Sequence, residues 1–295
     1  MKGIILAGGR GTRLRPITSV VNKHILPVYD KPMIYYPLSI LMLAGIRDIL
    51  IICNPHDIQL FRNLFGDGGH LGLKITYDRQ EEPNGVAEAL IIGESFIDND
   101  KVCLILADNL FVGEGFSNAL RKSFQLDSGA IVYGYKVNDP QRFGVVEFDE
   151  NGTAKSIIEK PTKPKSNFAV TGLYFYDENA SIYAKTLKKS SRGELEITEL
   201  NKIYLDQRKL KVEILGRGFI WMDMGTIDAL NDAGILIKGM QHSQGFMVGC
   251  LEEIALTQGW TTEAELELQV RKHTNTKYGS YLKGLTTQKS LLRRD

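Results

Sequence analysis

The 295-residue sequence predicts an α/β protein built on a mostly parallel sheet. Three observations favour this class. Short apolar runs alternate with segments of helical length through the first half of the chain. These runs are nearly continuous, as expected for strands that are covered on both faces. The second half contains an Asn-Gly turn between two apolar segments, which predicts a small β insertion.

The first half predicts strands and helices in strict alternation. Gly45 and Gly66 follow two of the helical segments, and glycine is the usual residue just past a helix end. The expected strands cover residues 3–7, 48–53, 73–77, 102–107 and 130–135. The expected helices cover residues 33–44, 56–65, 86–93 and 115–124. Helices of this kind are the usual connections between parallel strands.

The second half changes character. Strands at 144–148 and 153–158 flank the Asn151-Gly152 turn, and a further strand is expected at 170–176. Helices are expected at 196–205 and 226–238, and a helical pattern continues from 252 to about 286. Residues 288–295 are polar and basic, and we expect them to be frayed. The chain is therefore expected to form one domain over 1–240 and a helical region over 241–295.

Composition argues against nucleic-acid and membrane partners. The chain has 36 Lys and Arg against 35 Asp and Glu, so no overall field attracts polyanions. No stretch reaches the roughly 18 apolar residues that cross a bilayer. The three cysteines, Cys53, Cys103 and Cys250, form no CxxC pair, and the first two lie in apolar runs. We expect buried free thiols and a cytoplasmic protein.

A glycine-rich segment directly follows the first predicted strand. Gly8, Gly9 and Gly11 allow backbone N–H groups to approach a phosphate, and Arg13 and Lys23 add positive charge. The Walker pattern fails because no Gly-Lys-Ser/Thr follows, and the dinucleotide fingerprint fails because its third glycine is missing. The glycines alone fit either a nucleotide-binding turn of another kind or a tight turn beside solvated arginines.

Several sequence blocks resemble the sugar nucleotidyltransferase family. Residues 8–14 read Gly-Gly-Arg-Gly-Thr-Arg-Leu, and Lys23 and Leu26-Pro27 follow at the family's positions. Further blocks resemble the glucose-1-phosphate thymidylyltransferases in particular, and the likeness extends to about residue 285. These blocks lie at residues 29–38, 137–140, 144–148, 159–161, 165–167, 172–177 and 192–198.

The resemblance implies both a fold and an activity. It implies a Rossmann-like nucleotidyltransferase core and transfer of a nucleotidyl group from dTTP to glucose 1-phosphate with Mg²⁺ as the cofactor. It also implies a homotetramer, and a dTDP-sugar as regulatory ligand bound between subunits near the C-terminal helical region. No nucleic acid or membrane takes part in such a reaction.

The family's metal ligands correspond to Asp108 and Asp223. Asp108 directly follows the predicted strand 102–107, and ligands bind at that edge of an open α/β sheet. Carboxylate oxygen is the ligand that Mg²⁺ prefers. Without the resemblance, Asp108 fits a turn residue and Asp223 fits a helix cap equally well.

The resemblance implies catalysis by positioning and charge neutralisation. The attacking sugar phosphate has a second pKa of about 6 and is ionised at neutral pH, so no general base is needed. Accordingly, no Ser-His-Asp or Cys-His arrangement is recognisable in the sequence. Arg13 and Lys23 are expected to hold the β- and γ-phosphates, and Lys160 and Arg192 the phosphate of the sugar.

The remaining expected contacts concern the base and the sugar. Gln80 is expected to pair with the base, because an amide both donates and accepts, and Gly85 offers a backbone N–H. Glu159 is expected to accept hydrogen bonds from sugar hydroxyls, while the backbone of Gly144 and Val170 lines the sugar. The other expected substrate-binding residues are Gly8, Gly9, Gly11, Thr12, Pro83 and Asn109.

Five residues depart from the family pattern. Arg10 replaces a small residue, His24 and Glu88 replace Gln, Ala107 replaces Gly, and Met224 replaces Thr. These departures bear on the choice of base and sugar. Two alternatives therefore stay open beside the thymidylyltransferase: the same chemistry with UTP or a modified hexose 1-phosphate, and a non-catalytic regulatory protein that binds nucleotide sugars.

Overall fold

The computed structural model describes residues 1–287; the tail that was expected to be frayed, residues 288–295, lies outside the described residues. The described chain forms a main sheet of nine strands. Four neighbouring strands are parallel, in the order β6–β1–β4–β5, with β5 at the edge of the sheet. They are β1 (Lys2–Ala7), β4 (Asp48–Cys53), β5 (Lys74–Arg79) and β6 (Val102–Leu106). The predicted α/β class and its central parallel strands are confirmed.

The other half of the sheet is largely antiparallel. Its strands are β8 (Ala130–Lys136), β9 (Gly144–Phe148), β10 (Ala154–Glu159), β11 (Phe168–Tyr176) and β12 (Leu210–Leu215). Strand β11 pairs antiparallel with β6, β8 and β9, and β12 adds to β8 in parallel. The predicted hairpin is confirmed as β9–β10, and Gly152 in its turn has a φ of 77°. Strand β12 was not predicted.

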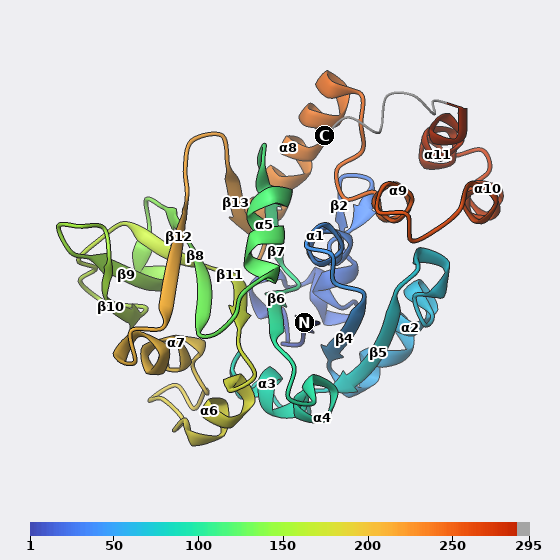
Figure 1. The fold of residues 1–295 in the computed structure, drawn as a ribbon. Helices are drawn as coiled ribbons and strands as arrows, with labels where there is room; N and C mark the ends of the chain where they lie inside the picture. Colours follow the sequence, from blue (N-terminus) through green and yellow to red (C-terminus); the bar gives the residue numbers. More distant parts are fainter. Residues whose placement is uncertain (288–295) are drawn as a thin grey trace.

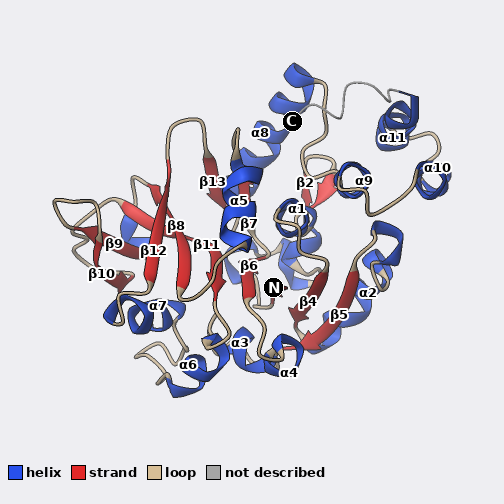
Figure 2. Ribbon diagram, in the orientation of Figure 1, coloured by secondary structure: helices blue, strands red, loops and turns tan. Residues whose placement is uncertain are grey.

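Helices cover both faces of the sheet, as Figures 1 and 2 show. Successive residues of β1 belong to opposite layers: Ile5 packs into one apolar cluster and Ile4 into the other. The first cluster includes residues of α1 (Tyr35–Leu43), α2 (Ile58–Phe65), α5 (Phe116–Phe124) and α9 (Leu251–Thr257). The second includes residues of α3 (Glu88–Ile92), α6 (Ala180–Thr186) and α7 (Ile197–Asp206). Burial on both sides explains the continuous apolar runs.

The predicted helices match with shifted ends. The segment 86–93 contributes only α3, and α4 (Glu94–Ile97) follows it directly. The helix expected at 226–238 is α8 (Ile227–Gln244), which begins at the Thr226 cap and runs six residues further. Gly45 and Gly66 end α1 and α2 with positive φ values of 89° and 59°, which glycine adopts without strain.

A second, two-stranded sheet lies against the carboxyl end of β6. It pairs β7 (Asn109–Val112) with β13 (Ile220–Asp223), so that Asn109 stands opposite Asp223. The Met224 N–H extends the contact by donating to the carbonyl of Asp108 at 2.8 Å. This sheet brings two segments that are far apart in the sequence to one place. A third small sheet pairs β2 (Pro27–Val28) with β3 (Lys31–Pro32).

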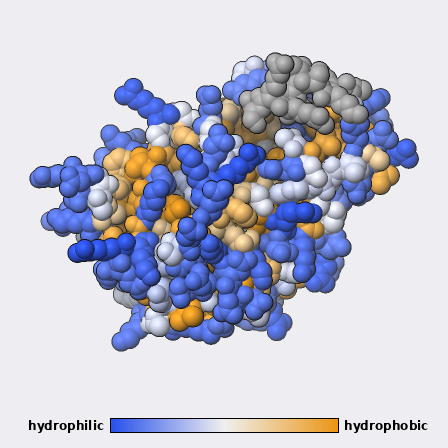
Figure 3. All heavy atoms as spheres, in the orientation of Figure 1, coloured by the Kyte–Doolittle hydropathy of each residue, from blue (hydrophilic) through white to orange (hydrophobic). Residues whose placement is uncertain are grey.

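The C-terminal region is helical, as predicted. It comprises α9, α10 (Glu263–Lys272) and α11 (Lys277–Thr287), and α10 starts with a capping box between Thr262 and Glu265. The division at residue 240 stays a prediction; α8 spans that residue. No helix in residues 1–287 is long and apolar enough to cross a membrane. Hydrophilic side chains cover most of the face drawn in Figure 3.

Candidate active site

Three neighbouring pockets lie around the ends of β1 and β6. The amide pocket, about 220 Å³, includes Gly8, Gln80, Gly85, Leu106 and Asp108 in its lining. The arginine pocket, about 490 Å³, includes Arg13, Asp108, Arg142, Lys160, Arg192 and Asp223. The loop pocket, about 480 Å³, includes Gly9, Arg10, Arg15, Asn54 and Glu82. Asp108 and Leu106 belong to both the amide and the arginine pockets, which therefore adjoin.

Most of the residues expected from the sequence converge on these pockets. Only Gly11 and Thr12 of that set line none of the three. Gly11 instead shapes the turn, with a φ of 55° and a carbonyl that accepts from the Thr18 hydroxyl at 2.6 Å. Gly8 is a close approach: a Cβ there would stand 2.5 Å from Gln80 Oε1. Glycine at position 11 is therefore favoured by the backbone conformation of the turn, and glycine at position 8 by the closeness of the Gln80 side chain.

Asp108 lies two residues beyond the end of β6 and is a buried ion-pair partner. Its Oδ2 accepts from Lys23 Nζ at 2.5 Å, and its Oδ1 accepts from the Asn109 amide at 3.1 Å. Burial alone would raise the pKa of Asp108, but the adjacent Lys23 charge outweighs burial and holds the pKa well below its usual range. Asp108 is therefore a carboxylate at neutral pH.

Asp223 faces the same pocket with a different charge environment. Its Oδ2 lies 3.6 Å from Arg142 and 3.9 Å from Arg13. Burial and the neighbouring Asp108 charge nevertheless raise the pKa of Asp223 above its ordinary value. A divalent cation between two such carboxylates would relieve their repulsion, so the donor set fits one. No cluster of three or more His, Cys, Asp or Glu suited to a metal occurs within residues 1–287.

The far end of the arginine pocket is an ionic network. Arg192 makes its closest contact with Glu196 at 2.7 Å and also reaches Glu194 and Glu159, at 3.1 and 3.3 Å. Lys160 lies 3.7 Å from Glu159, at a positive φ of 40°. A guanidinium and an ammonium on one wall can bind a phosphate. The carboxylates among them can accept hydroxyl hydrogens.

Sequence reasoning missed several residues of this pocket. The Thr198 hydroxyl donates to Glu159 Oε2 at 2.5 Å, and a Cβ on Gly144 would stand 2.8 Å from that hydroxyl. Glu196 sits below Arg192, and Arg142 reaches Asp223. Glu196 and Thr198 lie within the block 192–198 that resembles the family, and Arg142 lies between two such blocks; these positions are the signal that could have drawn attention to them.

Gln80 lies at the base of the amide pocket and is only 4% exposed. Its Nε2 donates to Glu88 Oε2 at 2.7 Å and to the Gly85 carbonyl at 3.2 Å. Asn84 donates to the other Glu88 oxygen at 2.8 Å. Gly85 has a φ of 114°, and a Cβ there would stand 2.4 Å from the carbonyl oxygen of Leu195. This position therefore requires glycine.

The loop that carries Gln80 and Gly85 is joined to the loop that carries Arg192. Leu195 N–H donates to the Asn84 carbonyl at 2.6 Å, and Ala87 N–H donates to the Leu195 carbonyl at 3.2 Å. Lys189 Nζ adds a hydrogen bond to Asn84 Oδ1 at 2.7 Å. We call residues 80–88 and 189–196 the paired loops. They form adjoining walls of the amide and arginine pockets.

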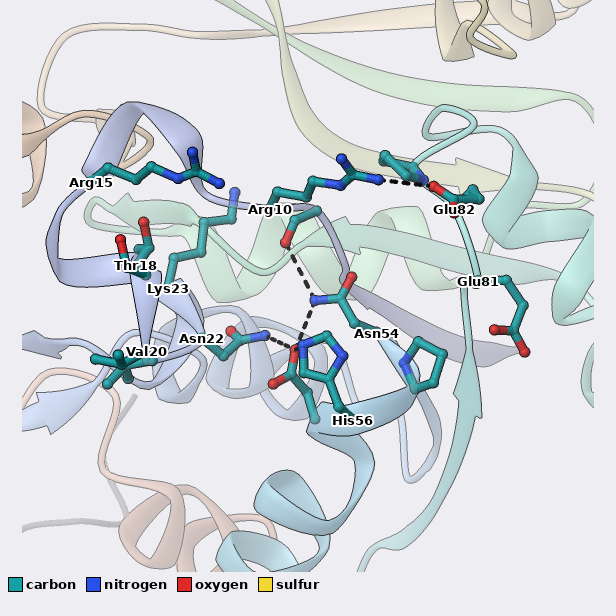
Figure 4. A pocket seen from close by; sticks show the side chains of 16 residues that line it. Arg10, Arg15, Thr18, Val20, Asn22, Lys23, Asn54, His56, Glu81 and Glu82 are labelled. Atoms are coloured by element: carbon teal, nitrogen blue, oxygen red, sulfur yellow. Dashed lines mark hydrogen bonds and ion pairs between the residues drawn. The ribbon is translucent and has the colours of Figure 1, made fainter.

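The five departures from the family pattern fall into two groups. Arg10 and His24 line pockets, and Glu88 stands behind Gln80, which donates to it. Ala107 and Met224 are fully buried in apolar clusters and line none of the three pockets. Burial, helped by the Lys23 charge, lowers the pKa of His24 to about 3. Figure 4 shows Arg10 extended across the loop pocket to Glu82, at 3.1 Å, while Arg15 and Lys23 enter from the other side.

The whole-chain comparison agrees with this arrangement. The nucleotidyl transferase family model matches residues 2–238, which include every pocket residue discussed above. The chain belongs to the nucleotidyl transferase family. A UDP-glucose pyrophosphorylase structure solved with UDP-glucose, 24% identical, has a TM-score of 0.71 over 81% of this chain and 98% of its own, and it supports the fold alone.

Closer relatives share one name. The glucose-1-phosphate thymidylyltransferase of Neisseria gonorrhoeae is 56% identical over 282 residues, covering 96% of this chain and 98% of the relative. That of Mycobacterium tuberculosis H37Rv is 51% identical with the same coverage. A Bacillus anthracis structure with sucrose, described under that enzyme's name, is 42% identical with a TM-score of 0.74, over 80% of this chain and 94% of its own. The resemblance to the glucose-1-phosphate thymidylyltransferases is confirmed.

Proposed function

We propose that the protein transfers a thymidylyl group from dTTP to glucose 1-phosphate, forming dTDP-glucose and releasing pyrophosphate. The observation that carries this proposal is the junction of the amide and arginine pockets at Asp108. A base bound beside Gln80 directs its triphosphate toward the glycine-rich turn. A sugar phosphate bound by Lys160 and Arg192 approaches from the arginine pocket. Relatives named for this reaction, at 50–56% identity, support the choice of substrates.

The reaction requires positioning more than proton transfer. An oxygen of the sugar phosphate attacks the α-phosphorus of dTTP, and the bond from that phosphorus to the pyrophosphate oxygen breaks. The attacking phosphate is ionised above its second pKa of about 6, so no side chain must remove a proton. Arg13 and Lys23 offset the charge that gathers on the pyrophosphate, and Arg142 lies close enough to contribute. Lys160 and Arg192 align the nucleophile.

A divalent cation is a general requirement of the family, and we propose Mg²⁺ at Asp108 and Asp223. Two carboxylates in one pocket fit Mg²⁺, which takes one or two protein carboxylates and completes its coordination with substrate phosphates and water. When bound, the ion supplies positive charge to the phosphate oxygens. The donor set is all oxygen, which argues against zinc.

We further propose a cytoplasmic homotetramer with a dTDP-sugar as regulatory ligand near residues 241–295. The near-zero net charge and the buried free thiols suit the cytoplasm. Exposed apolar side chains on α8, Ile227 and Ile235, support contacts between subunits. Light scattering after size exclusion, with and without dTDP-sugars, tests the assembly and its response. A monomer at micromolar concentration would contradict it.

The test of function is pyrophosphate release from dTTP, UTP, ATP, CTP and GTP with glucose 1-phosphate, with and without Mg²⁺. We expect metal-dependent release that is strongest with dTTP. Strongest release with UTP, or release only with a modified hexose 1-phosphate, would favour the alternative substrates. Nucleotide-sugar binding with no release from any pair would favour the non-catalytic regulatory protein.

A further inference from the structure

The Gln80 side chain has both of its donor hydrogens engaged within the protein. A carboxamide carries two N–H donors on nitrogen and a single acceptor oxygen. The Nε2 hydrogens point to Glu88 Oε2 and to the Gly85 carbonyl, at 2.7 and 3.2 Å. A carboxylate and a carbonyl only accept, so both neighbours require the nitrogen on their side. The orientation of the amide therefore follows from the hydrogen-bonding chemistry of its two partners.

The oxygen of the same amide is left for a ligand. Gln80 Oε1 accepts no hydrogen bond from any residue in the described part of the chain, although the side chain is only 4% exposed. It lies beside Gly8, where the lack of a Cβ keeps the approach open. Both residues line the amide pocket. The oxygen is therefore an acceptor that the pocket leaves open to a ligand with an N–H or O–H group.

Glu88 holds the Gln80 amide in this orientation. Its second oxygen accepts from Asn84 at 2.8 Å, so the carboxylate is held from two sides with one oxygen facing Gln80. Glu88 stands at the start of α3, whose next two residues, Ala89 and Leu90, are fully buried. The carboxylate is thus anchored to the core rather than to a mobile loop.

We infer that Glu88 is a positioning residue that sets base specificity, by holding Gln80 so that the amide pocket presents an acceptor alone. This inference rests on the proposed function. Thymine and uracil carry an N–H at position 3 that can donate to Gln80 Oε1. Cytosine carries a bare nitrogen there, so two acceptors would face each other. The Gly85 N–H, which has no partner within residues 1–287, is available for a base carbonyl.

The experiment compares dUTP with dCTP, which share a sugar and lack the thymine methyl group, so only the pairing edge differs. The ratio of their kcat/KM values with glucose 1-phosphate is measured for wild type, Glu88→Gln and Glu88→Leu. We expect Glu88→Leu to reduce the preference for dUTP over dCTP about tenfold or more. The variant leaves one Gln80 N–H donor without its partner, and the free-energy cost of such an unpaired donor no longer favours the orientation that presents the acceptor oxygen. Glu88→Gln should reduce the preference less, since its amide oxygen can still accept. The change should fall mainly on nucleotide KM.

Two further variants separate the possible results. Glu94→Gln removes one carboxylate from the adjoining α4, where Glu94 is exposed and pairs with Lys185, and it should leave the ratio unchanged. Gln80→Ala should collapse the ratio. If Gln80→Ala lowers the ratio and both Glu88 variants keep it, the inference is wrong while the base site stands.

The ratio is also measured as dissociation constants of dUTP and dCTP without sugar phosphate. A protein that binds both nucleotides but turns over neither dUTP nor dTTP would contradict the proposed function. The binding ratio of the Glu88 variants would still decide the inference. A merely structural role for Glu88 would weaken the binding of both nucleotides equally, and that outcome overturns it.

Discussion

Lys23 Nζ and Asp108 Oδ2 form a 2.5 Å ion pair in which both side chains are largely shielded, at 14% and 11% exposure. Lys23 begins the short helix Lys23–Ile25 after the glycine-rich turn, and Asp108 lies two residues beyond the end of β6. The pair joins the segment expected to bind triphosphate to the strand end expected to bind metal. Removing either side chain would leave the other charge largely buried and unpaired, which is destabilising.

Replacing Asp108 with Asn should lower turnover at least about 100-fold, because the substitution removes the negative charge that holds a divalent cation. The fold should survive with reduced stability, since Asn is the same size but Lys23 loses its ion-pair partner. Pyrophosphate release and far-ultraviolet circular dichroism measure the two effects. Asp127→Asn, at a fully exposed aspartate, is the matched control. An active Asp108→Asn enzyme would remove this residue from the metal site.

Replacing Lys160 with Ala should raise KM for glucose 1-phosphate by about tenfold or more and leave KM for dTTP nearly unchanged. The ammonium lies in the arginine pocket beside Glu159, on the wall assigned to the sugar phosphate. Steady-state kinetics with each substrate varied in turn provides the measurement. Lys163→Ala, at an exposed neighbour, controls for loss of a surface charge. Equal changes in both KM values would contradict the assignment.

Replacing His24 with Gln should flatten the dependence of stability on pH in the acid range. The pKa of His24 is lowered from 6.5 to about 3, first by burial and then by Lys23. Between these values the unfolded chain binds a proton that the folded chain does not. Stability is therefore complete above pH 6.5 and is lost as pH falls toward 3, by about 2 kcal/mol at pH 5.

Urea unfolding at pH 7.5 and pH 5 measures this loss for wild type and for His24→Gln. The variant should lose less stability than wild type between the two conditions. His56→Gln, at a histidine whose side chain is 82% exposed, should behave as wild type does. Parallel losses in wild type and His24→Gln would show that His24 is not buried in its neutral form.

The ion pair between Arg10 and Glu82 should contribute little to stability. The two side chains are 67% and 64% exposed, and such pairs contribute less than about 1 kcal/mol. A double-mutant cycle of Arg10→Ser and Glu82→Gln, read from urea unfolding, should give a coupling below that value. The coupling should shrink further in about 1 M salt, where screening is strong. A coupling of several kcal/mol would show that the pair is shielded in solution.

The sequence predicted the central sheet because its signal is local. Apolar runs such as 48–53 are long enough to read without knowledge of their neighbours. Strands β7 and β13 were missed because each has four residues, which is too short for a pattern. Strand β12 was missed although Leu210–Leu215 alternates clearly, so that signal was available.

The candidate site was predictable as a set of residues but not as a set of contacts. Resemblance supplied Gln80 as a group that would both donate and accept. In the structure its donors are engaged, because Glu88 approaches from the start of α3. Likewise, nothing local in the sequence tells that Thr198 donates to Glu159, 39 positions away. Such pairings depend on how separate elements pack, and a pattern along one chain does not contain that information.

The paired loops connect a wall of the amide pocket to a wall of the arginine pocket. Leu195 is bonded to both Asn84 and Ala87, and Gly85 packs against its backbone without a side chain between them. These contacts tie the two walls to each other. We therefore expect the substrate that binds first to order the surface that receives the second, which would lower the entropic cost of binding the second molecule.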